Sequence, residues 1–240
     1  MGNVCSAQGK YEMALEEKEK CLAIRIKTLG EDHPELTATK YNVASLLEEQ
    51  GELARAEVLF RECADIYSKV HGAEHEETLD ALERVGNVCD AQGKYEMALE
   101  QKEKCLAIKI KTLGEDHPHV GAKYGNIAGV YFSQSKYEMA LEQFMKCLPI
   151  MIKALGEDHP EVGSIKYGMA CVLEAQGELA RAEGLFRECA DTFCKVHGAE
   201  HEYTLDALER ARDCENGNFI RTSIPEEYDL MTSWHRCCLS

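Results

Sequence analysis

Histidine and glutamate recur in this sequence at spacings that zinc enzymes use. Segments 71–75 and 197–201 both read His-Gly-Ala-Glu-His, which matches the H-x-x-E-H string of one class of zinc peptidases. That string binds zinc when a helix places both histidines on one face, whereas the glycine at its second position indicates a break between two helices. No third ligand recurs beside it. We therefore expect linker histidines here and no metal site.

Other candidate chemistry is equally sparse. One set of histidines recurs every 42 residues, so its members lie too far apart to share an ion whose bonds are about 2 Å long: His33, His75, His117, His159 and His201. The sequence contains no phosphate-binding glycine loop and no serine nucleophile elbow, and it singles out no base for a cysteine nucleophile. We expect no enzyme activity, no catalytic residue and no cofactor.

The 12 cysteines could indicate a disulfide framework. Five of them, however, fall at one repeating helical position: Cys21, Cys63, Cys105, Cys147 and Cys189. A position that repeats along a helix face is typical of core packing, and buried cysteine behaves as a small hydrophobic residue. We therefore interpret these cysteines as part of the core.

A 42-residue repeat must position all of these residues. The period appears in the turn glycines Gly9, Gly51, Gly93 and Gly177, with Ser135 at the one substituted point. One unit predicts two helices, over 35–50 and 53–70, each with apolar residues at three- and four-residue spacing. Residues that are always small predict close approach of the paired helices: Ala44, Gly86, Ala128 and Ala170, with Ala14, Ala56, Ala98, Ala140 and Ala182.

The segment between consecutive units contains helix stop and start signals. Gly30 is expected to end one helix, and Pro34 suits the first turn of the next. Asp32 with Glu35, repeated as Asp158 with Glu161, matches a capping box. The histidine between aspartate and proline is therefore expected to lie in a linker.

The loop sequence Leu-Gly-Glu-Asp-His-Pro, at residues 29–34, 113–118 and 155–160, resembles the hallmark of a known family. It is similar to the 42-residue tetratricopeptide repeat of the kinesin light chain type. The resemblance implies an all-α fold, a right-handed superhelical solenoid of helix-turn-helix repeats. It also implies a non-catalytic scaffold for protein interactions, similar to the cargo-binding repeat domain of kinesin light chain.

The repeat defines the expected domains. We expect a repeat array over residues 1–214, with an incomplete first repeat and a terminal capping helix at about 203–214. Residues 215–240 leave the pattern and are expected to form a flexible tail. Segments 51–83 and 177–209 are identical at 28 of 33 positions, which indicates that a block of three repeats was copied.

Charge and hydropathy restrict the partners. The formal net charge of −16 disfavours nucleic acid, because phosphate backbones would be repelled. Protein or peptide segments, basic ones in particular, fit this charge, although acidic surfaces also serve solubility alone. No apolar run approaches the ~20 residues that cross a bilayer, and we expect a cytoplasmic protein.

The resemblance also predicts a binding surface, because first helices line the concave face in this family. An aromatic and acidic stripe follows those helices, and we expect it to contact a basic segment unless it is merely solvated. The predicted binding residues are Tyr41, Asn42, Ser45, Glu48, Glu83, Asn87, Asp90, Asn126, Phe132, Tyr167, Cys171 and Glu174.

The chain departs from kinesin light chains in two respects. Their paired asparagines are reduced to Asn42 and Asn126, with Arg84 and Gly168 at equivalent points, and the stripe is acidic rather than basic. Recognition of acidic cargo is therefore not expected. The heptad coiled coil that joins light chains to the motor is absent from this sequence, so we do not expect kinesin heavy chain to bind this chain alone.

Both ends of the sequence match lipidation patterns. Met1 to Ser6 fits the myristoylation motif at Gly2, with Cys5 available for palmitate, and Cys237 begins a prenylation box. Both matches also have an explanation without lipidation. The first residues repeat a helix segment of the later repeats, and the last four residues can match the prenylation box by chance. The alternative functions are thus a lipid-anchored membrane adaptor, with membrane contact only if lipidated, or a free-standing signalling regulator built on the same repeats.

Overall fold

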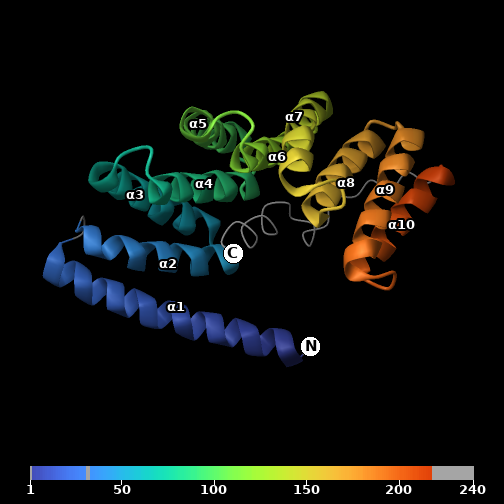
Figure 1. Ribbon diagram of the computed structural model, residues 1–240. Coiled ribbons are helices and arrows are strands. Elements are labelled where there is room, and N and C mark those ends of the chain that lie inside the picture. The colour runs from blue at the N-terminus through green and yellow to red at the C-terminus, as the bar shows by residue number, and fades with distance from the viewer. Residues whose placement is uncertain (1, 31–32, 218–240) are drawn as a thin grey trace. The chain divides into compact units, whose positions relative to one another are not determined.

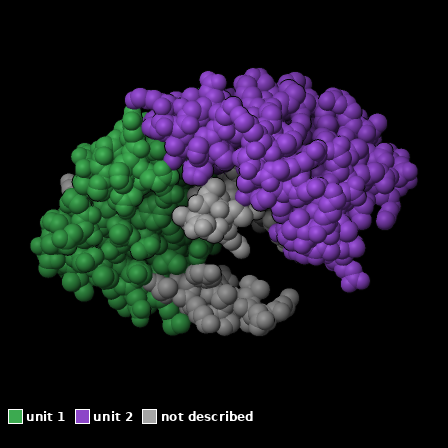
Figure 2. Space-filling view, in the orientation of Figure 1, with its two compact units in different colours: residues 1–105 green, residues 106–240 purple. Residues whose placement is uncertain are grey.

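The computed structural model describes residues 2–30 and 33–217, with side chains from Met13 onward except that of residue 14. The chain forms two compact units, residues 1–105 and residues 106–240, which are described separately (Figure 2). The predicted tail, 215–240, lies almost entirely outside the described residues.

Residues 1–105 are helical. They contain α1 (Gly2–Leu29), the short 3₁₀ helix η1 (Pro34–Leu36), α2 (Thr37–Glu49), α3 (Leu53–His71), α4 (Glu76–Ala91) and most of α5 (Tyr95–Leu113). Residues 106–240 contain the end of α5, then α6 (Pro118–Ser133), α7 (Tyr137–Leu155), α8 (Pro160–Ala175), α9 (Leu179–His197) and α10 (Glu202–Glu215). The described part of the chain has no strand, which confirms the all-α repeat fold (Figure 1).

The expected helical hairpins are present. The prediction of helices over 35–50 and 53–70 is confirmed by η1 with α2, which ends at Glu49, and by α3. In the second unit, α8 and α10 both pack on α9 (Figure 1). The second helices α3, α7 and α9 are thus each covered by the first helix of their own repeat and the first helix of the next.

The first repeat differs from its prediction. Helix α1 runs unbroken through Gly9, so the expected turn at this glycine is wrong. A break at Gly9 would need a packed partner on each side of it, because short helices are stable only when they pack. Cys21 is consequently exposed, since no first helix of its own repeat covers it.

Small residues lie where paired helices meet, as predicted. Ala44, Ala128 and Ala170 have no exposed surface, and Gly86 is buried. A Cβ atom added to Gly86 would lie 3.2 Å from Cγ of Lys102 and 3.5 Å from the Ala98 carbonyl oxygen. The helices α4 and α5 therefore approach closely there, and an added Cβ would require the Lys102 side chain to shift.

Four of the five repeat cysteines are core residues. Cys63, Cys105, Cys147 and Cys189 are completely buried, which confirms their interpretation as hydrophobic side chains. Burial raises the pKa of the Cys63 thiol to about 12, so this group stays protonated at neutral pH. A protonated, inaccessible thiol is a poor nucleophile, consistent with a packing role.

The turn within each hairpin requires a left-handed residue. Gly51, Gly93 and Gly177 have φ angles of 78°, 72° and 80°, and Ser135 adopts the same conformation with φ 57°. The turn is held by the same bonds in each case; for example, the amide of Lys136 donates to the Tyr131 carbonyl at 2.9 Å. A side chain with a Cβ is strained in this region, and Ser135 is the one described non-glycine residue with positive φ.

Replacement of Ser135 with glycine should raise the free energy of unfolding by about 1 kcal/mol, because it removes this strain. Thermal or urea unfolding measures the change. Gly177→Ser is the matched reverse variant: a Cβ has open space there, so only the backbone cost applies. Its stability should fall by a similar amount. Equal stability of wild type and both variants would contradict the prediction.

Linker histidines cap the first helices. In His33, His75, His117, His159 and His201 the ring Nδ1 accepts a hydrogen bond from the amide two residues later, at 3.2–3.4 Å. The predicted capping box is therefore wrong: His159, not Asp158, is the N-cap residue. The Asp158 carboxylate instead accepts a bond from Lys195 at 2.6 Å. Asp32 lies outside the described residues.

His159→Ala should destabilise the second unit by about 1 kcal/mol, as expected for the loss of an N-cap acceptor. His159→Asn keeps an acceptor at the cap and should retain most of the stability. Chemical denaturation of both variants against wild type makes the comparison. If alanine and asparagine behaved alike, the imidazole would have no capping role.

Candidate protein-interaction surface

The predicted binding residues all lie on first helices. Tyr41, Asn42, Ser45 and Glu48 are on α2, and Glu83, Asn87 and Asp90 are on α4. Asn126 and Phe132 are on α6, and Tyr167, Cys171 and Glu174 are on α8. The structure places these side chains in two different environments, buried and accessible.

In the second unit, α8 presents its predicted residues to α10 rather than to solvent. The Tyr167 hydroxyl donates to the Asp206 carboxylate at 2.6 Å, and Arg210 pairs with Glu174. Tyr167 and Glu174 are only 1% and 2% exposed. Both are therefore structural, and their assignment to a binding surface is corrected.

The pKa of the Tyr167 phenol is raised, mainly because the ring is buried. Nearby charges also act, with the Asp206 carboxylate favouring the neutral phenol and the Arg210 guanidinium opposing it. The guanidinium lies 5.2 Å from the centre of the Phe186 ring, a cation–π distance. A buried hydroxyl and a buried ion pair thus link α8 to α10, and the cation–π contact links α10 to α9.

The first unit contains the same group of residues. The Tyr41 hydroxyl donates to Asp80, Arg84 pairs with Glu48 at 2.6 Å, and the Arg84 guanidinium lies 5.2 Å from the Phe60 ring centre. Burial and the Asp80 carboxylate raise the pKa of the Tyr41 phenol. We call these four polar residues and their four equivalents in the second unit the Tyr-Asp-Arg-Glu clusters.

Three further predicted residues are also buried. Glu83, Asn126 and Cys171 are 3%, 4% and 2% exposed. Cys171 belongs to the core cluster of the second unit, and burial raises the pKa of its thiol to about 12. These residues have too little accessible surface to contact a partner, so their assignment is corrected as well.

The remaining predicted residues stay accessible. On α2, Asn42 is exposed and Ser45 and Glu48 are half-buried; on α4, Asn87 and Asp90 are half-buried. Because Tyr41, Asp80, Arg84 and Glu48 hold α2 against α4, these accessible residues form one surface within the first unit. We call Asn42, Ser45, Glu48, Asn87 and Asp90 the α2–α4 surface. Phe132, in the second unit, is half-buried beside the Tyr137 ring.

Sequence reasoning missed the aspartates and arginines of the two clusters. Each aspartate lies 39 residues after its tyrosine, and each arginine 36 residues after its glutamate. Both spacings are shorter than the 42-residue period, because each pair joins one first helix to a slightly earlier point on the next first helix. The 126-residue shift that relates the duplicated blocks also relates the two clusters, and this signal could have identified them.

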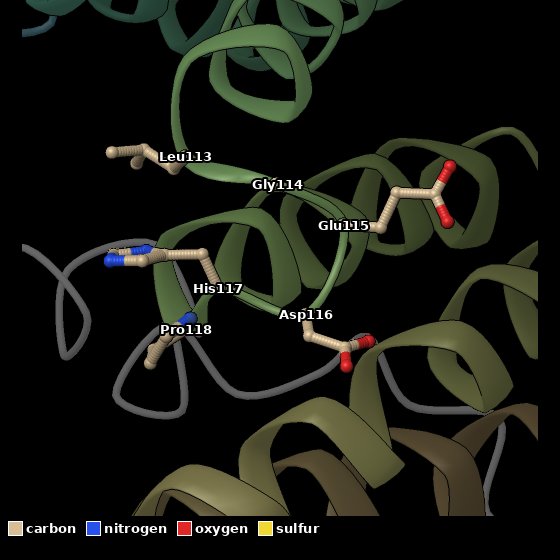
Figure 3. Close-up of a pocket in the computed structure, with 6 residues that line it drawn as sticks. All are labelled: Leu113, Gly114, Glu115, Asp116, His117 and Pro118. Atoms are coloured by element: carbon tan, nitrogen blue, oxygen red, sulfur yellow. The ribbon is translucent and has the colours of Figure 1, made fainter.

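The loop between α5 and α6 encloses a shallow hollow lined by residues 113–118 (Figure 3). The side chains of Leu113 and His117 lie on one side of this loop, and the carboxylates of Glu115 and Asp116 lie on the other (Figure 3). His117 caps α6, and Asp116 accepts a bond from Lys153 at 2.7 Å. These polar groups serve the linker itself.

Comparison with known families identifies the repeat. The family model described as tetratricopeptide repeat matches residues 1–67, 35–111 and 119–195, which together cover most of the sequence. The chain belongs to the tetratricopeptide repeat family. Proteins with this repeat generally serve as non-catalytic interaction scaffolds.

Solved structures support the same fold for this tetratricopeptide repeat protein. A kinesin light chain-type protein of Podosopora anserina with nearly identical repeats is 22% identical, with a TM-score of 0.66 over 85% of this chain and 95% of that one. The apo form of RapI is 15% identical, with a TM-score of 0.67 over 97% and 71%. A Rap protein complexed with Competence and Sporulation Factor is 12% identical, with a TM-score of 0.62 over 98% and 64%. At these identities the likeness shows the fold alone.

Two further findings concern the relatives and the membrane contact of this tetratricopeptide repeat chain. Among curated proteins, none matches the sequence. Within residues 2–30 and 33–217, no helix is long and apolar enough to cross a membrane. The lipidation candidate Cys237 lies outside the described residues, as do the side chains at Gly2 and Cys5, so lipid anchoring stays a prediction from the sequence.

Proposed function

We propose that this chain is a non-catalytic scaffold whose α2–α4 surface binds a basic protein or peptide segment. The observation that carries the proposal is the accessible set of hydrogen-bonding side chains on two first helices that are fastened together. Asn42 offers an amide donor and acceptor, and Asn87, whose Oδ1 accepts from Lys102, offers an amide donor; both suit the backbone of an extended segment. Glu48 and Asp90 add carboxylates.

Electrostatics favour a basic occupant. The chain carries a formal charge of −16, and the α2–α4 surface contains two carboxylates and no cation. Two cations adjoin this surface: Arg84 pairs with Glu48 at 2.6 Å, and Lys102 donates to the Asn87 side chain, so the preference for a basic occupant rests on Asp90 and on the charge of the whole chain. Lysine and arginine side chains of a partner would therefore be attracted, with the largest effect on the association rate and on selectivity.

The relatives support a protein or peptide partner. The tetratricopeptide fold is a general interaction scaffold, and one solved protein of similar fold was crystallised with Competence and Sporulation Factor bound. The choice of a basic segment rests on the residues of this chain alone.

Fluorescence anisotropy with two pools of labelled random peptides tests the proposal. The pools share length and apolar composition, and one contains Lys and Arg where the other contains Asp and Glu. We expect binding of the basic pool, weakening as salt is raised. Equal binding of both pools, or of neither, would contradict a basic partner.

A pair of single-charge variants tests the location. Asn42→Lys adds one positive charge on the α2–α4 surface, and it should weaken binding of the basic pool several-fold. Asp65→Asn changes the net charge by the same amount at an exposed site on α3, and it should have little effect. If both variants weakened binding equally, net charge rather than the α2–α4 surface would be responsible.

A further inference from the structure

The helix break between α3 and α4 does not separate the two histidines of the first His-Gly-Ala-Glu-His segment. His71 is the last residue of α3, and His75 is the N-cap of α4. Gly72 turns the chain between them with φ 98°. The imidazole rings consequently stack, with centroids 4.6 Å apart and planes inclined by 26°. Gly72 therefore does not hold the two imidazoles apart, contrary to the expectation from the sequence.

A third candidate ligand lies in the first turn of α4. The Glu77 carboxylate oxygen is 3.3 Å from Nε2 of His71 and 3.6 Å from Nδ1 of His75. One donor atom from each of the three residues lies within 4.8 Å of the other two. Among the described residues, this is the one group of three such side chains that meets this distance.

These distances suit a tetrahedral ion. Zinc bonds to imidazole nitrogen and carboxylate oxygen are about 2.0–2.1 Å long, so neighbouring ligand atoms lie about 3.3–3.4 Å apart. The two histidine–glutamate distances already approach this value. The side chains are 39–50% exposed, which leaves them free to adjust and leaves a fourth position for water. Two imidazoles and one carboxylate form a ligand set for zinc-like transition ions rather than for calcium or magnesium.

The capping role of His75 sets the cost of metal binding. Its Nδ1 accepts from the Glu77 amide at 3.4 Å, so this nitrogen carries a lone pair rather than a proton. An ion on Nδ1 would compete with this one hydrogen bond, which is the longest of the five histidine caps. The ion would therefore displace only a weak hydrogen bond.

The duplicated segment supplies an internal comparison. His197 and His201 stack with the same 4.6 Å separation and 26° inclination. The residue equivalent to Glu77, however, is Tyr203, whose ring lies 4.9 Å from that of His201. A neutral phenol is a poor substitute for a carboxylate as a zinc ligand, so the second copy offers two ligands instead of three.

We propose that His71, His75 and Glu77 bind a zinc-like divalent ion that fastens the end of α3 to the start of α4. Because the second copy has Tyr203 where the first has Glu77, the site is restricted to the first of the two copies. The ion would stabilise the interhelical loop. Water would occupy its fourth coordination position, which no protein side chain fills. The site shares neither its residues nor its ligand with the α2–α4 surface, so loss of zinc binding and loss of peptide binding are separate outcomes.

Isothermal titration of the full chain with zinc chloride, after chelator treatment and without an affinity tag, tests the proposal. We expect wild type to bind one zinc ion. Both His71→Ala and Glu77→Tyr should lower the affinity for this ion at least tenfold. His197→Ala is the matched control and should retain the wild-type affinity. Circular dichroism verifies that each variant stays helical, as expected for changes at exposed loop positions.

The reverse exchange makes the test decisive. Tyr203→Glu recreates the third ligand in the second copy and should add a second zinc equivalent. Cobalt substitution then distinguishes ligands, because binding through cysteine produces a sulfur-to-cobalt charge-transfer band and binding through histidine and glutamate does not. Identical zinc binding by wild type and Glu77→Tyr would overturn the proposal. So would a cobalt spectrum dominated by sulfur, or the absence of any gain in Tyr203→Glu.

Discussion

Replacing Glu174 with alanine is expected to lower the free energy of unfolding by roughly 3–5 kcal/mol, because it leaves a buried cation without its partner. Arg210 is 7% exposed, and Glu174, with which it pairs, is 2% exposed. After the substitution, the Tyr167 hydroxyl, 3.2 Å from Nη1, is a neutral and weaker partner. Chemical denaturation measures the total loss, and hydrogen exchange of α8 and α10 reports whether the second unit opens first.

Two variants control for this expectation. In Glu174→Leu combined with Arg210→Met, apolar groups replace both charges, so most of the lost stability should return. Glu48→Ala breaks the equivalent pair in the first unit, where both side chains are 22% exposed, and water can solvate the remaining Arg84. Its cost should be clearly smaller. A loss no larger for Glu174→Ala than for Glu48→Ala would show that burial does not control the energetics of this pair.

Phe186→Ala is the second substitution with a large expected effect, again roughly 3–5 kcal/mol. The ring has no exposed surface and packs edge-on against Tyr167, with centroids 5.2 Å apart and planes at 71°. Alanine would leave a cavity between α8, α9 and α10 and would remove the cation–π partner of Arg210. Denaturation against wild type and against Phe186→Leu, which retains most of the volume, measures the cavity contribution.

The duplicated block provides a matched experiment for this prediction. Phe60 is equally buried and packs against Tyr41 at 5.1 Å and 73°, so Phe60→Ala should have a similar cost in the first unit. Phe186→Ala combined with Glu174→Ala should cost less than the sum of the single losses, because both act on Arg210. Strict additivity would indicate that ring and carboxylate do not share this guanidinium, contrary to the structure.

Much of the fold follows from sequence features that act over short distances. The helix bounds of the internal hairpins follow from apolar residues at three- and four-residue spacing and from glycines such as Gly51 and Gly72. The burial of Cys63 was predictable from its repeating position, and so was the close packing at Gly86. The exception is α1, which runs unbroken through Gly9 although the same local pattern predicts a turn there.

The candidate surface was less predictable. The spacing of the stripe does not show whether a residue faces solvent or a neighbouring first helix. Tyr41 and Tyr167 have the spacing expected of a binding stripe, yet each hydroxyl bonds to an aspartate on the next first helix. The side chains that face the adjacent helix depend on the angle and register at which two helices cross. Asn42, one position further along, is exposed.

The sequence by itself therefore determined the period, the internal helical hairpins with their turns, and four of the five repeat cysteines as buried, since each depends on neighbours within a few turns of one helix. Only the tertiary structure decided which first-helix residues remain accessible and that His71, His75 and Glu77 meet across a helix break. The physical reason is the same in both cases. Packing between helices and the turn at Gly72 bring together groups whose proximity no periodicity encodes.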